Sequence, residues 1–179
     1  MKRLILMLRT VGLAVLLSFG VTGVTSLVGV TSALATDVGS GSCTGPSPCN
    51  RNNGHIGDNS CQGNQSCSRN NGDIEDDACL GFQACERNDG DIDDGSCSPG
   101  ACRKNTGDIG TDSCIGTFAC LRNDATVGND SCLGSRACLS NEGTIGNNSC
   151  KASRACESNK DVIGDDMCNT ANECQFGLP

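Results

Sequence analysis

The sequence predicts an all-β protein, a single-stack triangular β-solenoid of about eight 18-residue coils stapled by disulfides. Three observations predict this fold: an 18-residue unit that recurs from Ser42 to the C-terminus, two cysteines in each unit, and inward positions that alternate with polar ones. The unit is clearest over residues 131–148, SCLGSRACLSNEGTIGNN, and has the form S-C-x-G-x-x-A-C-x-x-N-x-G-x-I-G-x-x. A fixed period of this length is typical of a stacked repeat, because each unit supplies one turn of the stack.

Asn, a small residue and Ile occupy alternate positions late in the unit, as at Asn141, Gly143 and Ile145. This period of two predicts a short strand with one face held inside the coil. Gly and Asp or Asn then follow, which is chemistry that favours a corner. Three short strands and three corners per unit would make a triangular coil, and eight coils about 4.8 Å apart would make a rod roughly 35 Å long.

The cysteines predict a disulfide framework in an oxidising compartment, because all sixteen follow residue 42, their number is even and their spacing is fixed. They are Cys43, Cys49, Cys61, Cys67, Cys79, Cys85, Cys97, Cys102, Cys114, Cys120, Cys132, Cys138, Cys150, Cys156, Cys168 and Cys174.

Two pairings fit this spacing: within a coil, as Cys61 with Cys67, or between neighbouring coils, as Cys61 with Cys79. Cys97 and Cys102 enclose one residue fewer than the other pairs, while the sequence on both sides keeps its frame. A deletion inside a small closed loop is absorbed locally. This favours pairing within a coil, and a ladder between coils stays the alternative.

Residues 1–35 have the features of a secretory signal: a basic start, a long apolar run, and Ala33 and Ala35 at a small-residue cleavage site. We expect cleavage after Ala35 and a secreted or cell-surface protein, although the apolar run is also long enough for a retained membrane anchor. Residues 36–41 are expected to form a flexible leader, and residues 42–179 one repeat domain.

The two ends of the repeat depart from the unit. The first unit carries Pro46 and Pro48, which suit a cap that stops further strand pairing. The last loses the pattern after Cys174, and its apolar Phe176 and Leu178 are expected to fold over the open end.

Removal of Lys2, Arg3 and Arg9 with the signal leaves 10 basic and 21 acidic residues, a net charge of −11. This charge argues against nucleic acid or an anionic lipid surface as a partner. Of the 144 remaining residues only 18 are Leu, Ile, Val or Phe, with no Trp or Tyr. Disulfides must therefore stabilise a chain whose composition alone would suggest disorder.

Two family resemblances follow from the cysteine motifs. The frame I-G-x-x-S-C, followed by L-G-x-x-A-C at residues 80–85 and 133–138, resembles the hexapeptide repeat of left-handed β-helices. The spacing C-x-G-x-x-A-C resembles the disulfide-bridged coil of beetle antifreeze proteins, which implies a right-handed coil, so the handedness stays open. The hexapeptide frame would place Glu86, Lys151 and Glu157 inside, and unpaired buried charges are costly. We therefore expect the cysteines to point inward.

An acidic column at one corner is the candidate metal site, because carboxylate oxygens are ligands that Ca²⁺ prefers. Its residues are Asp58, Asp76, Asp77, Asp94, Asp165 and Asp166. The alternative is that Asp simply suits corners and keeps the protein soluble, and no calcium-type G-G-x-G-x-D repeat occurs. No other cofactor is expected.

Two further columns carry a functional and a structural interpretation. A basic column, formed by Arg51, Arg69, Arg87, Lys104 and Arg122, could dock an acidic glycan or form weak exposed ion pairs. The invariant Asn of each unit could form a recognition surface, but a hydrogen-bonded Asn ladder is the interpretation we favour.

The function that these features favour is an exported, non-enzymatic structural or surface-scaffold protein that associates with itself or with cell-surface and matrix components. Ice binding is one alternative, although Thr106, Thr117 and Thr144 lie in different columns rather than in ranks. A calcium- or glycan-binding module is another. An enzyme is not expected, because His55 is the single histidine, no catalytic constellation is recognisable and no small-molecule substrate is evident.

Overall fold

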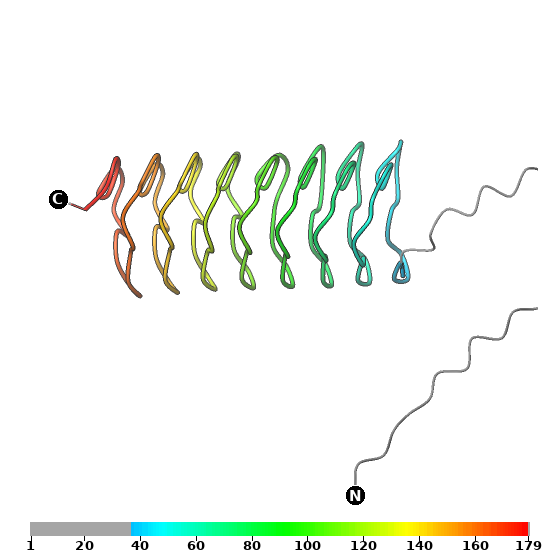
Figure 1. Ribbon diagram of the computed structural model, residues 1–179, viewed down its shortest axis with the longest axis horizontal. Helices are drawn as coiled ribbons and strands as arrows, with labels where there is room; N and C mark the ends of the chain where they lie inside the picture. The colour runs from blue at the N-terminus through cyan, green and yellow to red at the C-terminus, as the bar shows by residue number, and fades with distance from the viewer. Residues whose placement is uncertain (1–36, 179) are drawn as a thin grey trace, which may run out of the picture. The chain divides into compact units, whose positions relative to one another are not determined.

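The computed structural model describes residues 37–178, which form a stack of eight coils with one disulfide in each. Successive coils follow one another along the stack in chain order (Figure 1). The predicted signal at residues 1–35, its cleavage site and the alternative of an N-terminal anchor lie outside the described residues. Within residues 37–178, no helix is long and apolar enough to cross a membrane.

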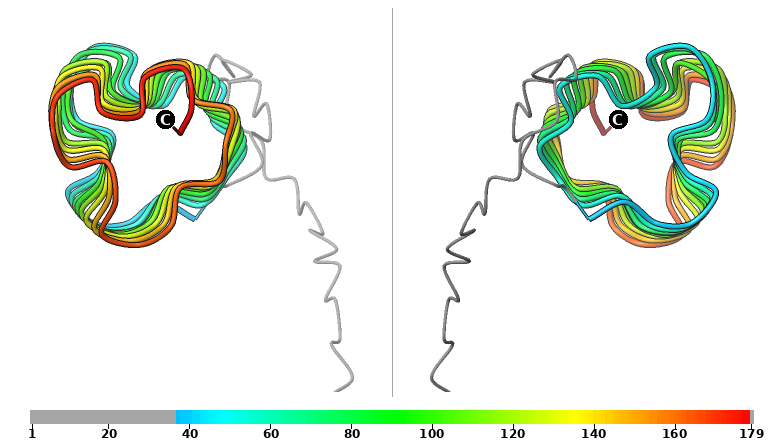
Figure 2. Two further views of the ribbon diagram at one scale, coloured as in Figure 1. Left: turned by 90° about the vertical axis from the view of Figure 1, so that its left-hand side faces the viewer. Right: turned by 90° about the vertical axis from the view of Figure 1, so that its right-hand side faces the viewer.

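The predicted all-β triangular solenoid is wrong in its class. The described residues contain no helix and no extended strand, and their β-structure consists of seven isolated parallel bridges that join one residue per coil. The bridge residues are Val38, Ile56, Ile74, Ile92, Ile109, Val127, Ile145 and Ile163. The rest of each coil is turns and bends, and its outline seen along the stack is lobed rather than triangular (Figure 2).

The backbone conformation explains why strands do not form. In the sixth coil Asp130, Cys132, Arg136 and Ser140 all have positive φ, between 53° and 57°. Extended strands need strongly negative φ, so each of these residues interrupts a strand. The next left-handed residue is Asn148, and the interval before it contains the bridge residue Ile145. Only this interval leaves room for a bridge.

Backbone hydrogen bonds nevertheless join the coils in a regular register. The N–H of Ile145 donates to the carbonyl of Thr126 in the preceding coil at 2.9 Å, and the N–H of Gly146 donates to the carbonyl of Ile163 in the following coil at 2.8 Å. Similar bonds recur around the coil, as from the N–H of Cys138 to the carbonyl of Ala119 at 2.7 Å. Spacing between coils is therefore that of neighbouring strands, about 4.8 Å.

The core is a narrow column of small and sulfur-containing side chains. Each interior coil contributes one Ile or Val, two half-cystines, and an Ala or Ser beside the second cysteine, nearly all fully buried. Buried Asn and Ser side chains complete the interior. Because so little of this surface is apolar, the polar side chains inside must have partners.

The ends of the stack differ from expectation. Val38 already bridges to Ile56, and the N–H of Gly39 donates to the carbonyl of Ile56 at 2.7 Å. Residues 38–41, expected as a flexible leader, are thus part of the first coil. At the other end Phe176 is 74% exposed and points away from the core, whereas Leu178 lines a hollow with Met167, Cys168 and Cys174 at the open end, so of the two expected residues only Leu178 lies there.

The two prolines of the first coil remove no backbone N–H group that would bond to a neighbouring coil. Pro46 and Pro48 occupy two positions of the disulfide loop. The equivalent residues of the second coil are Asn64 and Ser66, and their N–H groups donate to no neighbouring coil in the described stack. Their carbonyls still accept hydrogen bonds from the second coil, at 3.2 and 2.8 Å. A cap function for the two prolines is therefore not supported.

Candidate functional site

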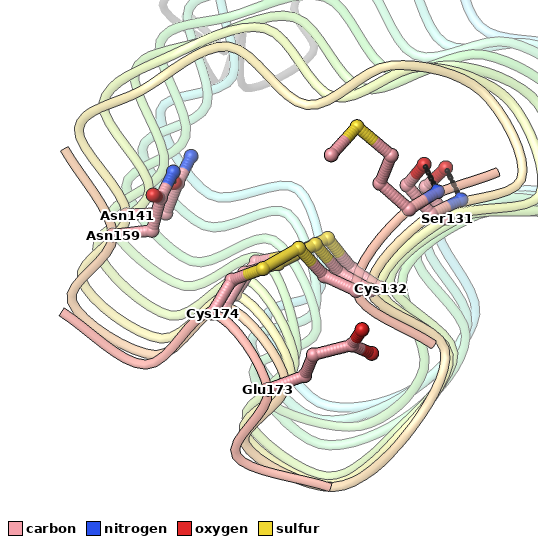
Figure 3. The surroundings of a disulfide bond; sticks show 12 residues. Ser131, Cys132, Asn141, Asn159, Glu173 and Cys174 are labelled. Atoms are coloured by element: carbon pink, nitrogen blue, oxygen red, sulfur yellow. Dashed lines mark hydrogen bonds between the residues drawn. A yellow bond between two sulfur atoms is a disulfide. The ribbon is translucent and has the colours of Figure 1, made fainter. Parts of the chain in front are cut away.

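The disulfides join the two cysteines of each coil, which is the pairing that the deletion in the fourth coil favours. Their Cα atoms lie 5.5 to 5.7 Å apart, and the shortened Cys97–Cys102 loop keeps a distance of 5.5 Å. The bridges stack above one another inside the coils, as Figure 3 shows between Cys132 and Cys174. The sulfur atoms of Cys79, Cys85 and Cys97 lie close together, but disulfide sulfurs are not the thiolates that bind zinc.

The buried Asn side chains form a ladder along one side of the core. In each coil the Nδ2 group donates to the Oδ1 atom of the preceding Asn and to the carbonyl two residues later, as Asn141 does to Asn123 at 2.8 Å and to Gly143 at 2.6 Å. Figure 3 shows Asn141 and Asn159 one above the other. The ladder interpretation of this column is confirmed, since each Asn is fully buried from the second coil to the seventh.

The buried Ser residues before the first cysteine form a second ladder on the other side of the disulfides (Figure 3). The hydroxyl of Ser131 accepts the N–H of Ser149 at 3.0 Å and donates to the carbonyl of Gly146 at 2.8 Å. Each hydroxyl therefore links its own coil to the next. The third coil has Ala78 at this position, so the ladder is interrupted there.

Replacing this alanine, Ala78→Ser, is expected to raise the free energy of unfolding by about 1 kcal/mol, because the buried Ser96 N–H and one carbonyl of the next coil would gain a partner. By the pattern of the other coils, the new hydroxyl would accept the N–H of Ser96 and donate to the carbonyl of Asp93. Denaturant unfolding measures the effect. The matched control is Ala84→Ser, since the equivalent Ser66 hydroxyl is buried without a partner. Equal effects of the two substitutions would contradict the ladder.

The predicted calcium ligands are engaged with the backbone of the stack. The Oδ1 atom of Asp76 accepts the N–H of Asp58 at 2.6 Å, and that of Asp94 accepts the N–H of Asp76 at 3.0 Å. Asp58 and Asp165 accept the N–H groups of Ser40 and Asn147 in the same way, at 2.6 and 2.7 Å. These carboxylates thus satisfy an outward-pointing donor of the preceding coil.

The remaining two predicted ligands, Asp77 and Asp166, have positive φ of 53° and 60° and form the next column. Asp166 accepts a hydrogen bond from the Asn148 side chain. The six carboxylates therefore lie in two columns along the stack. Asn129 and Asn147 occupy the first of these columns in later coils and accept the same backbone bond, at 3.1 and 2.9 Å, without a charge.

This equivalence predicts that Asp76→Asn changes the free energy of unfolding by less than about 0.5 kcal/mol, because an amide oxygen can accept the Asp58 N–H. Asp76→Ala, the matched control, is expected to cost about 1 kcal/mol through the lost hydrogen bond. Thermal unfolding with and without calcium chloride measures both. A calcium-dependent rise in Tm that Asp76→Asn abolishes would show a role beyond the hydrogen bond.

A third acidic column, which the sequence offers as ion-pair partners of the basic column, precedes the bridge residue. Asp73 accepts the N–H of His55 at 2.7 Å and Asp91 accepts that of Asp73 at 2.9 Å. Beside it, Asp93 lies in an open hollow of about 330 Å³ with Glu75, Asp94 and Thr111. Partial burial raises the pKa of Asp93, and the nearby charges of Asp94, Asp108 and Asp91 add to this. Among the described residues, no ion pair joins Asp73, Asp91 or Asp108 to the basic column.

The last coil places a charge where interior coils bury an alanine. Glu173 takes the position of Ala155 one coil earlier, and its carboxylate accepts hydrogen bonds from the N–H and the hydroxyl of Thr170, at 2.9 and 3.0 Å. These bonds lower the pKa of Glu173, the N–H first. Figure 3 shows Glu173 beside Cys174. Met167 likewise replaces the ladder Ser of the preceding coil.

The basic column, here called the basic ladder, consists of Arg51, Arg69, Arg87, Lys104 and Arg122. All five residues have φ between 57° and 62°. Their N–H groups hold them to the preceding coils, as from Arg69 to the carbonyl of Asn50 at 2.8 Å. Among the described residues their side chains make one ion pair, between Arg87 and Glu86 at 3.8 Å, and no hydrogen bond.

The shortened loop of the fourth coil opens two hollows on the surface. One, of about 230 Å³, is lined by Leu80, Pro99 and Ile115. The other, of about 320 Å³ and here called the aromatic groove, is lined by Phe82, Gln83, Pro99, Gly100, Arg103 and Phe118. The Phe82 and Phe118 side chains are 57% and 38% exposed.

Arg103 lines the aromatic groove but is not among the site residues that the sequence predicts. Its Nε atom is buried without a partner, and its Nη1 atom donates to the Oε1 atom of Gln83 at a long 3.3 Å. The sequence does contain one indication of its unusual position, because Leu121 and Leu139 occupy the same column in the next two coils.

Together these features define a repeat protein whose coils are each closed by a disulfide and joined by polar ladders. The chain belongs to the family DUF7640, a domain of unknown function, which matches residues 18–101 and again residues 98–177. No curated protein and no solved structure matches the chain. The repeat is confirmed, and eight disulfides are typical of an oxidising, extracellular environment. The resemblance to beetle antifreeze proteins stays a hypothesis.

Proposed function

We propose that the chain is an exported, non-enzymatic structural protein that acts as a stiff scaffold or spacer. The observation that carries this proposal is the continuous register of the stack from Val38 to Cys174, in which every coil is closed covalently and bonded to its neighbours. Each coil contacts only the coils next to it, so stiffness depends on the interface between neighbours. That interface combines backbone hydrogen bonds with the Asn and Ser ladders.

The two ends of this scaffold are not equivalent. A further coil stacked on the last one would cover Glu173 and bury its carboxylate at a position where interior coils carry Ala. Burying an unpaired charge is costly, and inward-pointing charges are a common device against edge-to-edge association. The C-terminal coil is therefore closed to further stacking, which limits self-association to other surfaces.

A length test addresses the scaffold function directly. Duplication of residues 109–126, one complete coil, should lengthen the particle by about 4.8 Å, because each coil adds one interstrand spacing. Small-angle X-ray scattering of the oxidised protein measures the length, and limited proteolysis measures the integrity of the stack. A control insertion of 18 Gly and Ser residues after Cys174 should add a protease-sensitive tail. If the duplicated coil is cleaved or leaves the length unchanged, the scaffold proposal fails.

A further inference from the structure

The basic ladder has no structural role that would explain its charges. Its backbone position has positive φ, which costs less for Gly, Asn or Asp than for Arg or Lys. In the next two coils Ser140 and Ser158 occupy the same column with φ of 54° and 58°. The N–H of Ser140 keeps the bond to the preceding coil, at 2.9 Å to Leu121. The fold thus accepts an uncharged residue here.

The ladder also concentrates like charges along one line. Four of its side chains are exposed and that of Lys104 is half-buried, in five consecutive coils. Neighbouring positions are about 4.8 Å apart along the stack, so the cations repel one another unless anions lie between them. The ladder contrasts with the acidic column, whose carboxylates accept backbone hydrogen bonds.

We propose that the basic ladder binds a linear acidic glycan that runs along the stack. Charge complementarity favours a linear polyanion along the ladder, and the aromatic groove next to Lys104 favours a sugar chain among the polyanions. Arginine suits carboxylates because its guanidinium can form two parallel hydrogen bonds.

The aromatic groove supplies the second, independent observation. Arg103 directly precedes Lys104 of the ladder and lines the groove with Phe82 and Phe118. The groove therefore offers aromatic side chains for the apolar C–H face of a sugar and the terminal nitrogens of a guanidinium for its carboxylate. Of the aromatic side chains in the described residues, only Phe176 lies elsewhere. The inference goes beyond the scaffold function and does not require it.

Binding of polygalacturonate to the oxidised protein tests the proposal, with neutral dextran, polyglutamate and duplex DNA as competitors. The double variant Arg69→Ser with Arg87→Ser adopts the serine of later coils and is expected to bind about 5- to 30-fold more weakly, because each exposed charge contact is worth up to about 1 kcal/mol. The matched control is Lys151→Ser with Lys160→Ser, which removes two cations of the seventh coil and its exit, away from both the ladder and the aromatic groove. It should bind polygalacturonate within about twofold of the unchanged protein, because substitutions far from the ladder do not couple to it.

If both double variants bind polygalacturonate equally weakly, net charge alone explains binding and the ladder is not the site. If the unchanged protein does not bind polygalacturonate, the proposal is wrong. Equal affinity for polyglutamate would point to an acidic peptide instead, and equal affinity for DNA to an unspecific polyanion. Arg103→Leu, which copies Leu121 and Leu139, is expected to reduce the preference for polygalacturonate over polyglutamate. Unchanged thermal unfolding of each variant shows that the stack is intact.

Discussion

Reduction of all eight disulfides is expected to unfold the stack completely. In the chain-entropy model a closed loop of about seven residues stabilises the folded state by about 2 kcal/mol. Eight such loops then contribute on the order of 15 kcal/mol, as much as the whole stability of a typical domain. Two-dimensional amide NMR spectra with and without a reductant measure the result, and we expect the dispersed peaks of the oxidised protein to collapse.

The core gives the physical reason for so large an effect. Each interior coil buries one Ile or Val beside its bridge, and the first cysteine of every pair has positive φ, such as 56° at Cys132. Without the covalent closure, nothing comparable would hold this residue in its left-handed conformation. A reduced protein that keeps its dispersed amide peaks would contradict the central role of the bridges.

Position in the stack supplies a control for this prediction. Removing the bridge of the last coil, with Cys168→Ala and Cys174→Ala, should allow only local fraying, because that coil has one neighbour. Removing the bridge of the fifth coil, with Cys114→Ala and Cys120→Ala, should cost at least about 2 kcal/mol, because both flanking interfaces depend on it. Denaturant unfolding distinguishes the two double variants, and equal losses would argue against a stack of nearest neighbours.

The sequence could predict the period, the inward columns and the pairing within coils, because each depends on which residue recurs every 18 positions. It could not predict the backbone between the columns. Left-handed conformations fall on Cys132, Arg136 and Ser140, residue types that rarely adopt them, and no turn signal marks these positions. The alternation of Asn141, Gly143 and Ile145 therefore predicts a strand, whereas the structure has a single bridge residue in each coil.

The candidate sites divide along the same line. The sequence shows the acidic column as a recurrence of Asp. Its structural role is to accept hydrogen bonds from backbone N–H groups of the preceding coil, and the sequence does not show where those groups point. The aromatic groove depends on one missing residue in the fourth coil. Its loop keeps a Cα–Cα distance of 5.5 Å between Cys97 and Cys102, so the deletion is expressed at the surface as a hollow beside Pro99. The sequence revealed the deletion but not where the lost volume would appear.

Interruption of the Asn ladder at its centre is expected to cost roughly 3 to 5 kcal/mol, because Asn123→Ala leaves several buried groups without partners and creates a small cavity. The Nδ2 group of Asn123 donates to the Oδ1 atom of Asn105 at 2.9 Å and to the carbonyl of Ala125. Its Oδ1 atom accepts from Asn141 at 2.8 Å. Every one of these three asparagines is fully buried, so water cannot replace the lost bonds.

Denaturant unfolding of the oxidised protein measures this loss, and Asn50→Ala is the matched control because its side chain is exposed. We expect the control to change the free energy of unfolding by less than about 0.5 kcal/mol. Asn123→Asp should be at least as destabilising as Asn123→Ala, since a carboxylate cannot donate to Asn105 and would be buried with its charge. If Asn123→Ala and Asn50→Ala cost the same, the polar ladder contributes little, and the bridges and backbone bonds alone hold neighbouring coils together.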